Sequence, residues 1–268
     1  MGAAVWGALA AGLTGGGLAA QAAAPRYHPL LLDCAVYRQH IASEIELESG
    51  PNRSRERAGR EGILIVRAAA QDSLIRLEAW FDSLAVWREG NGGRTAPETD
   101  GVIGGRFRGT LTARGEYRPE ESPFVPDEVA AVSDVAGALA DFFPPLPERP
   151  LAEGETTQAE PGWRITRLGD GISEGRRTAR YRLERRLETA ATGVLADSVP
   201  VEARRTETEE GVLQWDPERG LVRWERAVRA AAAVPAGPGV PRAFRTAIWQ
   251  RVVVERVPGL GRDCTAEP

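Results

Sequence analysis

Apolar and polar residues alternate with a period of two along most of this chain, a pattern typical of half-buried antiparallel strands. In the clearest stretch, the apolar residues of one parity are Ile75, Leu77, Ala79, Phe81, Ala85 and Trp87. Most residues of the other parity are polar or charged, and Trp80 and Leu84 are among the apolar exceptions. The same alternation returns in several later segments, so we expect about ten to twelve strands.

One segment has helical spacing instead. Pro126 suits the first turn of a helix, and Pro144–Pro145 would end it. The apolar residues that recur at helical spacing between them are Val129, Val132, Val135, Ala136, Leu139, Phe142 and Phe143. The pattern predicts one main helix over residues 126–143, about 25 Å long, with its apolar stripe packed on one face of the sheet.

Strands that follow one another without regular strand–helix alternation favour an antiparallel sheet. We therefore predict an α+β, mostly β fold whose sheet is curved or forms a half-barrel. Residues 25–268 are expected to form a single β-rich domain. The proline-rich segment 144–160 is either a boundary between two lobes or a strap over the surface. Residues 216–220 (DPERG) have the composition of a tight turn between two strands.

The start of the chain resembles a targeting segment. Residues 1–24 contain no charged side chain and consist of an apolar run, three glycines and an alanine-rich end with small residues suited to cleavage. This pattern predicts a secretory signal peptide, although no basic residue precedes the apolar run. We expect the protein to be exported to the periplasm or the extracellular space.

The chain has two cysteines, Cys34 and Cys264. In an oxidising compartment two cysteines favour one disulfide. It would close a loop of about 230 residues and, in the chain-entropy model, stabilise the fold by roughly 4–5 kcal/mol. The alternative is two unpaired thiols.

Charge and composition exclude several classes of protein. There are 34 Lys+Arg against 38 Asp+Glu, a balance that argues against a nucleic-acid binder. No internal stretch approaches about 18 uncharged apolar residues, and the predicted strands carry too few apolar residues for a continuous lipid-facing band. We expect a protein that is not an integral membrane protein.

The sequence offers little for catalysis. Only His28 and His40 are available as a histidine base, and neither has an acidic residue suitably placed beside it. Residues 171–175 match the G-x-S-x-G nucleophile motif, but a hydrophilic strand follows where the motif needs a helix, so we interpret them as a hairpin turn. No spacing predicts a metal site or a phosphate-binding loop. We expect no catalytic residue, metal or cofactor, and therefore not an enzyme.

Aromatic residues on the predicted strands are the candidate ligand-binding residues, and they are Trp80, Trp87, Phe107, Trp163, Trp224 and Trp249. Such side chains usually fill a core. In a curved sheet they can instead line an apolar cavity. A cavity of a few hundred Å³ facing the helix would favour a binding protein, and a filled interior would favour a structural module.

Residues 144–156 contain a Pro-Pro-Leu-Pro, Pro-Leu and Gly-Glu-Thr series after the predicted helix. With this series, a signal peptide and a helix in the hollow of a curved sheet, the chain weakly resembles exported bacterial β-rich proteins with the plan of half-barrel lipid and lipoprotein carriers. The resemblance implies a non-enzymatic envelope protein that binds a lipid, a lipoprotein or another apolar ligand, and it assigns no binding residue. The alternatives are a structural or protein-interaction module of the envelope and a hydrolase that uses carboxylates alone.

Overall fold

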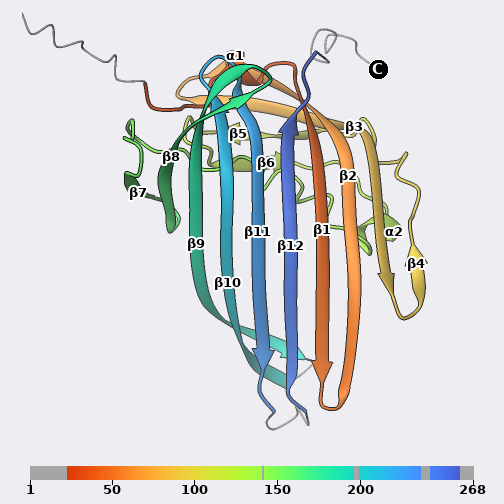
Figure 1. Cartoon of the computed structure of the whole chain (residues 1–268). Helices are drawn as coiled ribbons and strands as arrows, with labels where there is room; N and C mark the ends of the chain where they lie inside the picture. Colours follow the sequence, from red (N-terminus) through yellow and green to blue (C-terminus); the bar gives the residue numbers. More distant parts are fainter. Residues whose placement is uncertain (1–22, 141, 196–198, 237–241, 260–268) are drawn as a thin grey trace, which may run out of the picture.

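Long antiparallel strands dominate the structure, as the alternating pattern predicts (Figure 1). The computed structural model describes residues 23–140, 142–195, 199–236 and 242–259. In these ranges twelve strands form one sheet, in the order β6-β5-β3-β2-β1-β12-β11-β10-β9-β8-β7, with β4 paired to β3. Edge strands β6 and β7 do not pair with each other, so the sheet is open. The predicted mostly β fold with a curved antiparallel sheet is confirmed.

The two halves of the chain build the two halves of the sheet. The first half contributes β1 (Ala35–Ser49), β2 (Asn52–Gln71), β3 (Leu74–Gly90), β4 (Gly93–Thr95), β5 (Phe107–Leu111) and β6 (Tyr117–Glu121). The second half contributes β7 (Thr156–Ala159), β8 (Trp163–Ser173), β9 (Arg176–Leu195), β10 (Val199–Asp216), β11 (Gly220–Val234) and β12 (Phe244–Arg256). The two helices are single turns, α1 (Pro29–Leu32) and α2 (Asp127–Ala130). The first and last strands join the halves, because β1 pairs with β12 from Tyr37↔Arg256 to Ser49↔Phe244.

The sheet has an inner face, which carries the odd-numbered residues of β1 and every side chain in register with them. Its apolar residues form one continuous core that draws on both halves of the chain. The largest fully buried side chains of this core include Tyr27, Tyr37, Phe81, Phe107, Phe142 and Trp224. Their rings meet edge to face, as in the pair Tyr37–Phe142 with centroids 5.2 Å apart.

A bulge explains why Leu84 breaks the alternation in β3. Ile63 of β2 faces Ser83, and the next residue, Leu64, faces Phe81, so Asp82 is an extra residue in β3. An extra residue reverses which parity points inward. Leu84 therefore lies on the inner face and is buried, although its parity in the sequence is that of the charged residues.

The prediction of one main helix over residues 126–143 is wrong. Of the residues described in this segment, α2 alone is α-helical, and turns and irregular backbone follow it. Asp134 contributes to the break, because its carboxylate accepts a hydrogen bond from the backbone N–H of Gly137 at 2.9 Å. Side chains that bond nearby backbone groups compete with helical hydrogen bonds. The apolar residues that suggested a helix are buried all the same, Val129, Val135 and Leu139 among them.

Donors on the sheet take the place of helical hydrogen bonds. The Arg88 guanidinium donates to the carbonyl oxygen of Ala131 at 3.0 Å, and that of Arg60 donates to Asp134 O at 2.5 Å. The side-chain amide of Gln39 donates to Ala138 O at 3.3 Å. Three carbonyls of the segment are thus satisfied from outside it, which removes the need for a regular helix.

The segment of residues 122–140 and 142–150 crosses the inner face, and we call it the strap. Its proline-rich part packs inward, since Leu146 is 1% exposed. The Tyr27 hydroxyl donates to Pro144 O at 3.0 Å, and Leu146 N donates to Arg114 O at 2.9 Å.

Several sequence-based predictions concern residues outside the described ranges. All but the last two residues of the signal peptide 1–24 lie there, and so does Cys264. Cys34 precedes β1 directly, and Val257 N donates to Val36 O at 2.8 Å, so the last described residues pass close to the start of β1. Among the described residues, no helix is long and apolar enough to span a membrane.

Candidate functional site

The six candidate aromatic residues divide between the two faces of the sheet. Phe107, Trp163 and Trp224 lie on the inner face, and all three are buried. Trp80, Trp87 and Trp249 lie on the outer face, where Trp249 is 39% exposed.

Only two of the six residues come together on the inner face. Trp163 of β8 and Trp224 of β11 have ring centroids 6.4 Å apart and are inclined at 68°. Phe107 packs against Phe81 instead, with centroids 5.9 Å apart. The rings of Trp163 and Trp224 are therefore the part of the predicted set that can contribute to one interior site.

Trp80 and Trp87, the outer-face tryptophans of β3, pack against other residues of the protein. The Trp87 ring lies directly over Gly59, where a Cβ would come within 2.5 Å of the indole nitrogen. The guanidinium of Arg106 lies 3.7 Å from the Trp80 ring centroid, and that of Arg94 lies 4.9 Å from the Trp87 ring centroid. These arginines cover the two rings by cation–π contact.

A pocket of about 680 Å³ opens between the strap and the inner face of the sheet, and we call it the aromatic pocket. Phe143 and Leu146 of the strap form one wall, and Trp163 and Trp224 lie on the opposite side. Two arginines of the sheet, Arg185 and Arg226, also line it. Its volume lies within the range of small-molecule sites. The interior is therefore packed over much of its area but hollowed beside the strap.

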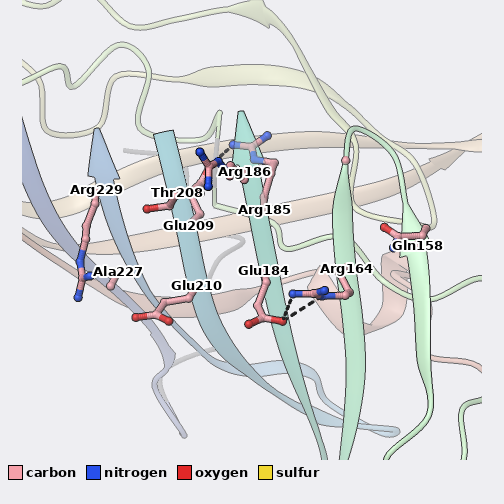
Figure 2. Close-up of a pocket in the computed structure, with 11 residues that line it drawn as sticks. Gln158, Arg164, Glu184, Arg185, Arg186, Thr208, Glu209, Glu210, Ala227 and Arg229 are labelled. Carbon is pink, nitrogen blue, oxygen red and sulfur yellow. Dashed lines mark hydrogen bonds and ion pairs between the residues drawn. The ribbon is translucent and has the colours of Figure 1, made fainter. Parts of the chain in front are cut away.

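Charged side chains lie on the inner face next to this pocket. The Glu209 side chain is 1% exposed and pairs with Arg185 and with Arg226, the latter at 2.5 Å. Figure 2 shows Arg185 on β9 beside Glu209 on β10, as their register requires. The Arg185 guanidinium also lies 4.7 Å from the Trp163 ring centroid. Burying such a cluster costs desolvation energy that a well-packed apolar set would avoid.

These charges belong to a polar row that crosses the inner face, which we call the belt. Its members are Arg60, Ser43, Gln250, Arg226, Glu209 and Arg185. Ser43 faces Gln250 across β1 and β12, and the Gln250 amide donates to the Ser43 hydroxyl at 3.1 Å. The belt separates the core under the strap from the half-buried inner face beyond it.

A second pocket of about 300 Å³ lies at the belt, beside strap residues between 132 and 138, and we call it the belt pocket. Its polar end is lined by Gln39, Arg60 and Arg226, which are 2%, 6% and 6% exposed. Burial lowers the pKa of Arg60 to about 10, with an opposing contribution from the Asp134 carboxylate, so the guanidinium stays charged at neutral pH. Ile41, Ile45, Ile248 and Val252 are apolar residues of its lining, which also includes the Ser43–Gln250 pair and strap residues between 132 and 138.

Beyond the belt, the central strands β1, β12 and β11 carry mostly apolar side chains on the inner face, which the strap does not cover there, and Glu56 of β2 and Glu207 of β10 flank them. Ile45 and Leu47 of β1 alternate with glutamates that point outward, and Ala230 and Ala232 continue the same face on β11. These side chains are half-buried, because neighbouring strands of the curved sheet shield them. We call this surface the trough.

The outer face carries a charged groove of about 450 Å³ (Figure 2). Arg164 of β8 and Glu184 of β9 form an ion pair across it at 3.1 Å. The small side chain of Ala227 leaves room between Glu210 and Arg229. Exposed pairs of this kind are individually weak and screened by salt, so the groove resembles a solvated face.

The residues that the sequence offered for catalysis cap a helix, lie exposed on the outer face or form a turn. The imidazole of His28 accepts a hydrogen bond from Leu30 N at 3.2 Å and caps α1. His40 is exposed on the outer face of β1. Residues 171–175 end β8 and form the turn to β9, with Glu174 and Gly175 at positive φ. No group of three or more His, Cys, Asp or Glu within the described ranges could hold a metal ion.

Sequence reasoning missed the belt. A weak signal was present, because Gln39 shares the parity of Tyr37 and Ile41, and Arg60 shares that of Leu64. A polar residue on an apolar parity points to a buried polar group, which needs a partner or a function.

Comparisons with known proteins give structural matches only. No protein-family model matches the sequence, and no curated protein does. Among solved structures, one describing lipid–protein interactions in lipovitellin matches 84% of this chain with 12% identity and a TM-score of 0.47. This chain covers 25% of that lipovitellin chain.

Two bacterial proteins match over similar lengths. Neisserial surface protein A matches 83% of this chain and 97% of its own, with 10% identity and a TM-score of 0.24. A DUF1329 family protein from Desulfovibrio piger matches 85% of this chain and 87% of its own, with 10% identity and a TM-score of 0.19. These structural matches have TM-scores below 0.5 and assign neither a family nor a function to this chain.

Proposed function

We propose that this chain is an exported, non-enzymatic protein that binds an apolar or amphiphilic molecule inside its curved sheet. The observation that carries the proposal is the aromatic pocket of about 680 Å³ between the strap and the Trp163–Trp224 pair. Aromatic and aliphatic walls with a few polar groups are the usual lining of small-molecule sites. Phe143 and Leu146 provide apolar walls, and Arg185 and Arg226 provide polar groups.

Two further features support this proposal. The trough continues the apolar inner face beyond the strap, which gives a long ligand room outside the pocket. Export is supported by the uncharged, alanine-rich residues 1–24 and their similarity to a signal peptide.

The first test is native mass spectrometry of the exported, purified protein, followed by organic extraction. A mass above that of the bare chain, with a lipid or lipopeptide in the extract, would support the proposal and identify the class of ligand. The bare mature mass, together with no binding of the neutral fluorescent probe N-phenyl-1-naphthylamine, would contradict it and favour a protein-interaction module.

A matched pair of variants tests whether the probe binds in the aromatic pocket. Ala140 is exposed and lines the aromatic pocket, whereas Ala136 is exposed on the same strap and lines none of the pockets described. Ala140→Trp should obstruct the pocket and weaken probe binding about tenfold or more, and Ala136→Trp should leave it unchanged. Equal effects of the two substitutions would place the probe elsewhere.

A further inference from the structure

Arg60 is a buried charge without a carboxylate partner. Its side chain lies on the inner face of β2, and the residue is 6% exposed. The guanidinium donates to the carbonyl oxygen of Asp134 at 2.5 Å, and its Nε has no hydrogen-bond partner. Among the described residues, no carboxylate forms an ion pair with it within 4 Å. A buried, unpaired cation is costly, so its site favours an anion.

The neighbouring carboxylate does not neutralise Arg60 by direct contact. Asp134 lines the same pocket, but its carboxylate accepts a hydrogen bond from Gly137 N in its own loop. The other buried cation at this end, Arg226, pairs with Glu209. Arg60 is therefore the group that remains available to a bound molecule.

A second buried polar group points to the same place. Gln39 is 2% exposed, and its amide nitrogen donates to Ala138 O at 3.3 Å. Its Oε1 atom is buried without a hydrogen-bond partner. Gln39 and Arg60 are diagonal neighbours on β1 and β2, because Gln39 faces Gly62 and Arg60 faces Ile41. Unsatisfied buried atoms on adjacent residues require an explanation, and a ligand is one.

The belt pocket is amphipathic along its length. Arg60 and Gln39 lie beside the strap, whereas Ile45 and Ile248, which face each other on β1 and β12, lie toward the trough. A molecule with one charged end and one apolar chain would match both parts of this lining.

We propose that the belt pocket binds the anionic headgroup, a carboxylate or a phosphate, of an amphiphile whose apolar chain lies along the trough, with Arg60 as the group that binds the anion. This inference rests on the proposed function and specifies its ligand. A guanidinium group pairs well with either anion, because its planar N–H donors match two anionic oxygens. The Gln39 Oε1 atom is placed to accept a hydroxyl hydrogen of the same headgroup.

The experiment compares three ligands with the same twelve-carbon chain by equilibrium dialysis against the mature protein. Laurate and dodecyl phosphate are anionic, and dodecanol is neutral. We expect at least one anion to bind about tenfold or more tightly than dodecanol, because a charge-assisted contact is lost with the alcohol. The tighter of the two anions distinguishes a fatty acid from a phosphate ester. Equal affinity for all three ligands would overturn the inference.

Arg60→Gln tests the residue, and Arg88→Gln is the matched control. Each substitution removes one arginine that donates to a strap carbonyl, but Arg88 is paired with Glu56 and does not line the belt pocket. Arg60→Gln should remove the preference for the anion while dodecanol affinity changes less than about twofold. Arg88→Gln should keep the preference. If both variants lose anion and alcohol binding equally, Arg60 only holds the strap and the inference fails.

Further results distinguish a failure of the headgroup assignment from a folding defect of the variant and from a failure of the proposed function. If Arg60→Gln does not fold, the comparison of the three ligands on the unmodified protein still decides the inference. If the protein binds neither dodecanol nor N-phenyl-1-naphthylamine, the proposed function itself fails. If it binds both but does not prefer an anion, only the headgroup assignment fails.

Discussion

Glu209 is a carboxylate with 1% of its side chain exposed, held between the guanidinium groups of Arg185 and Arg226. The residue that follows it, Glu210, points to the outer face and is exposed. The two glutamates are adjacent in sequence, so they differ only in the side of the sheet on which each lies.

This difference gives a prediction at the residue scale. Replacing Glu209 by Gln leaves two buried cations without their shared carboxylate and should lower the free energy of unfolding by about 3–5 kcal/mol. Glu210→Gln should change it by less than about 0.5 kcal/mol. Urea unfolding of the two variants measures both values. Similar small losses would mean that the buried cluster contributes little to stability.

Asp216 gives a second prediction at this scale, on pH dependence. Burial alone would raise its pKa, but Glu218 N–H and the Arg176 guanidinium donate to the carboxylate and hold its pKa below the ordinary value of 3.8. A lowered pKa in the folded state adds stability above the unfolded-state pKa, and this stability is lost as pH falls through the folded-state value.

Asp216→Asn should therefore lower the free energy of unfolding by about 1 kcal/mol at pH 7. The difference from the unmodified protein should shrink as the pH falls below about 4, because the carboxylate then takes up a proton in the unfolded state, and it is lost as the pH falls through the lower folded-state pKa. Thermal unfolding at pH 7 and pH 3 measures the two differences. Asp100 is exposed, and Asp100→Asn serves as the control that should change neither. A constant difference at both pH values would contradict the linkage.

At the scale of elements, alternation was sufficient to predict a mostly β fold with a curved antiparallel sheet. It failed where tertiary contacts decide the local structure. Residues 216–220 form the turn between β10 and β11, as their composition predicts. The sequence of residues 126–143 could not show that this segment forms an irregular strap and not a helix. Its carbonyl groups accept hydrogen bonds from Gln39, Arg60 and Arg88, which lie on strands far away in sequence. Propensity describes local preference, and these contacts are not local.

The candidate site was predictable only in part for a related reason. Trp163 and Trp224 were identified as aromatic residues on strands, but their facing positions depend on the register of β8 to β11. The extra residue at Asp82 reverses the parity of β3 and sends Trp87 outward. A change of one residue in register moves every later side chain to the other face.

The strap should contribute to stability through its buried residues. Leu146 is 1% exposed in the core, whereas Leu30 of α1 is 83% exposed. Leu146→Ala should lower the free energy of unfolding by about 2–5 kcal/mol, because it removes buried apolar atoms and leaves a cavity. Leu30→Ala should change it by less than about 0.5 kcal/mol. Equal values from chemical denaturation would show that the strap is not part of the cooperative fold.

At the scale of the whole molecule, β1 and β12, the first and last strands of the chain, pair with each other at the centre of the sheet. Every other strand therefore lies on the stretch of chain between two strands that are held together by backbone hydrogen bonds. A cross-link between the ends would restrict the unfolded chain over nearly its full length, which is where a disulfide has its largest entropic effect.

The Cys34–Cys264 disulfide remains a prediction with two measurable consequences. The intact mass of the exported protein should be two hydrogens lower than that of the fully reduced chain. Cys264→Ser should lower the free energy of unfolding by roughly 4–5 kcal/mol in the chain-entropy model. Ser43→Ala, a substitution elsewhere in β1, controls for general effects on the sheet. A full reduced mass would contradict the pairing.

The strap covers only one end of the long strands, and this has a consequence for their dynamics. Tyr37 and Leu47 belong to the same strand, yet Tyr37 is fully buried in the core and Leu47 lies in the uncovered trough. We therefore expect one end of this strand to open less readily than the other. In native-state hydrogen exchange, amide protection along β1 should decline from Tyr37 toward Leu47, with the free energy of local opening falling from the global value toward that of a frayed hairpin. A ligand in the trough would extend protection toward the strand tips, so the binding event would be recorded as slower exchange in half of a single strand.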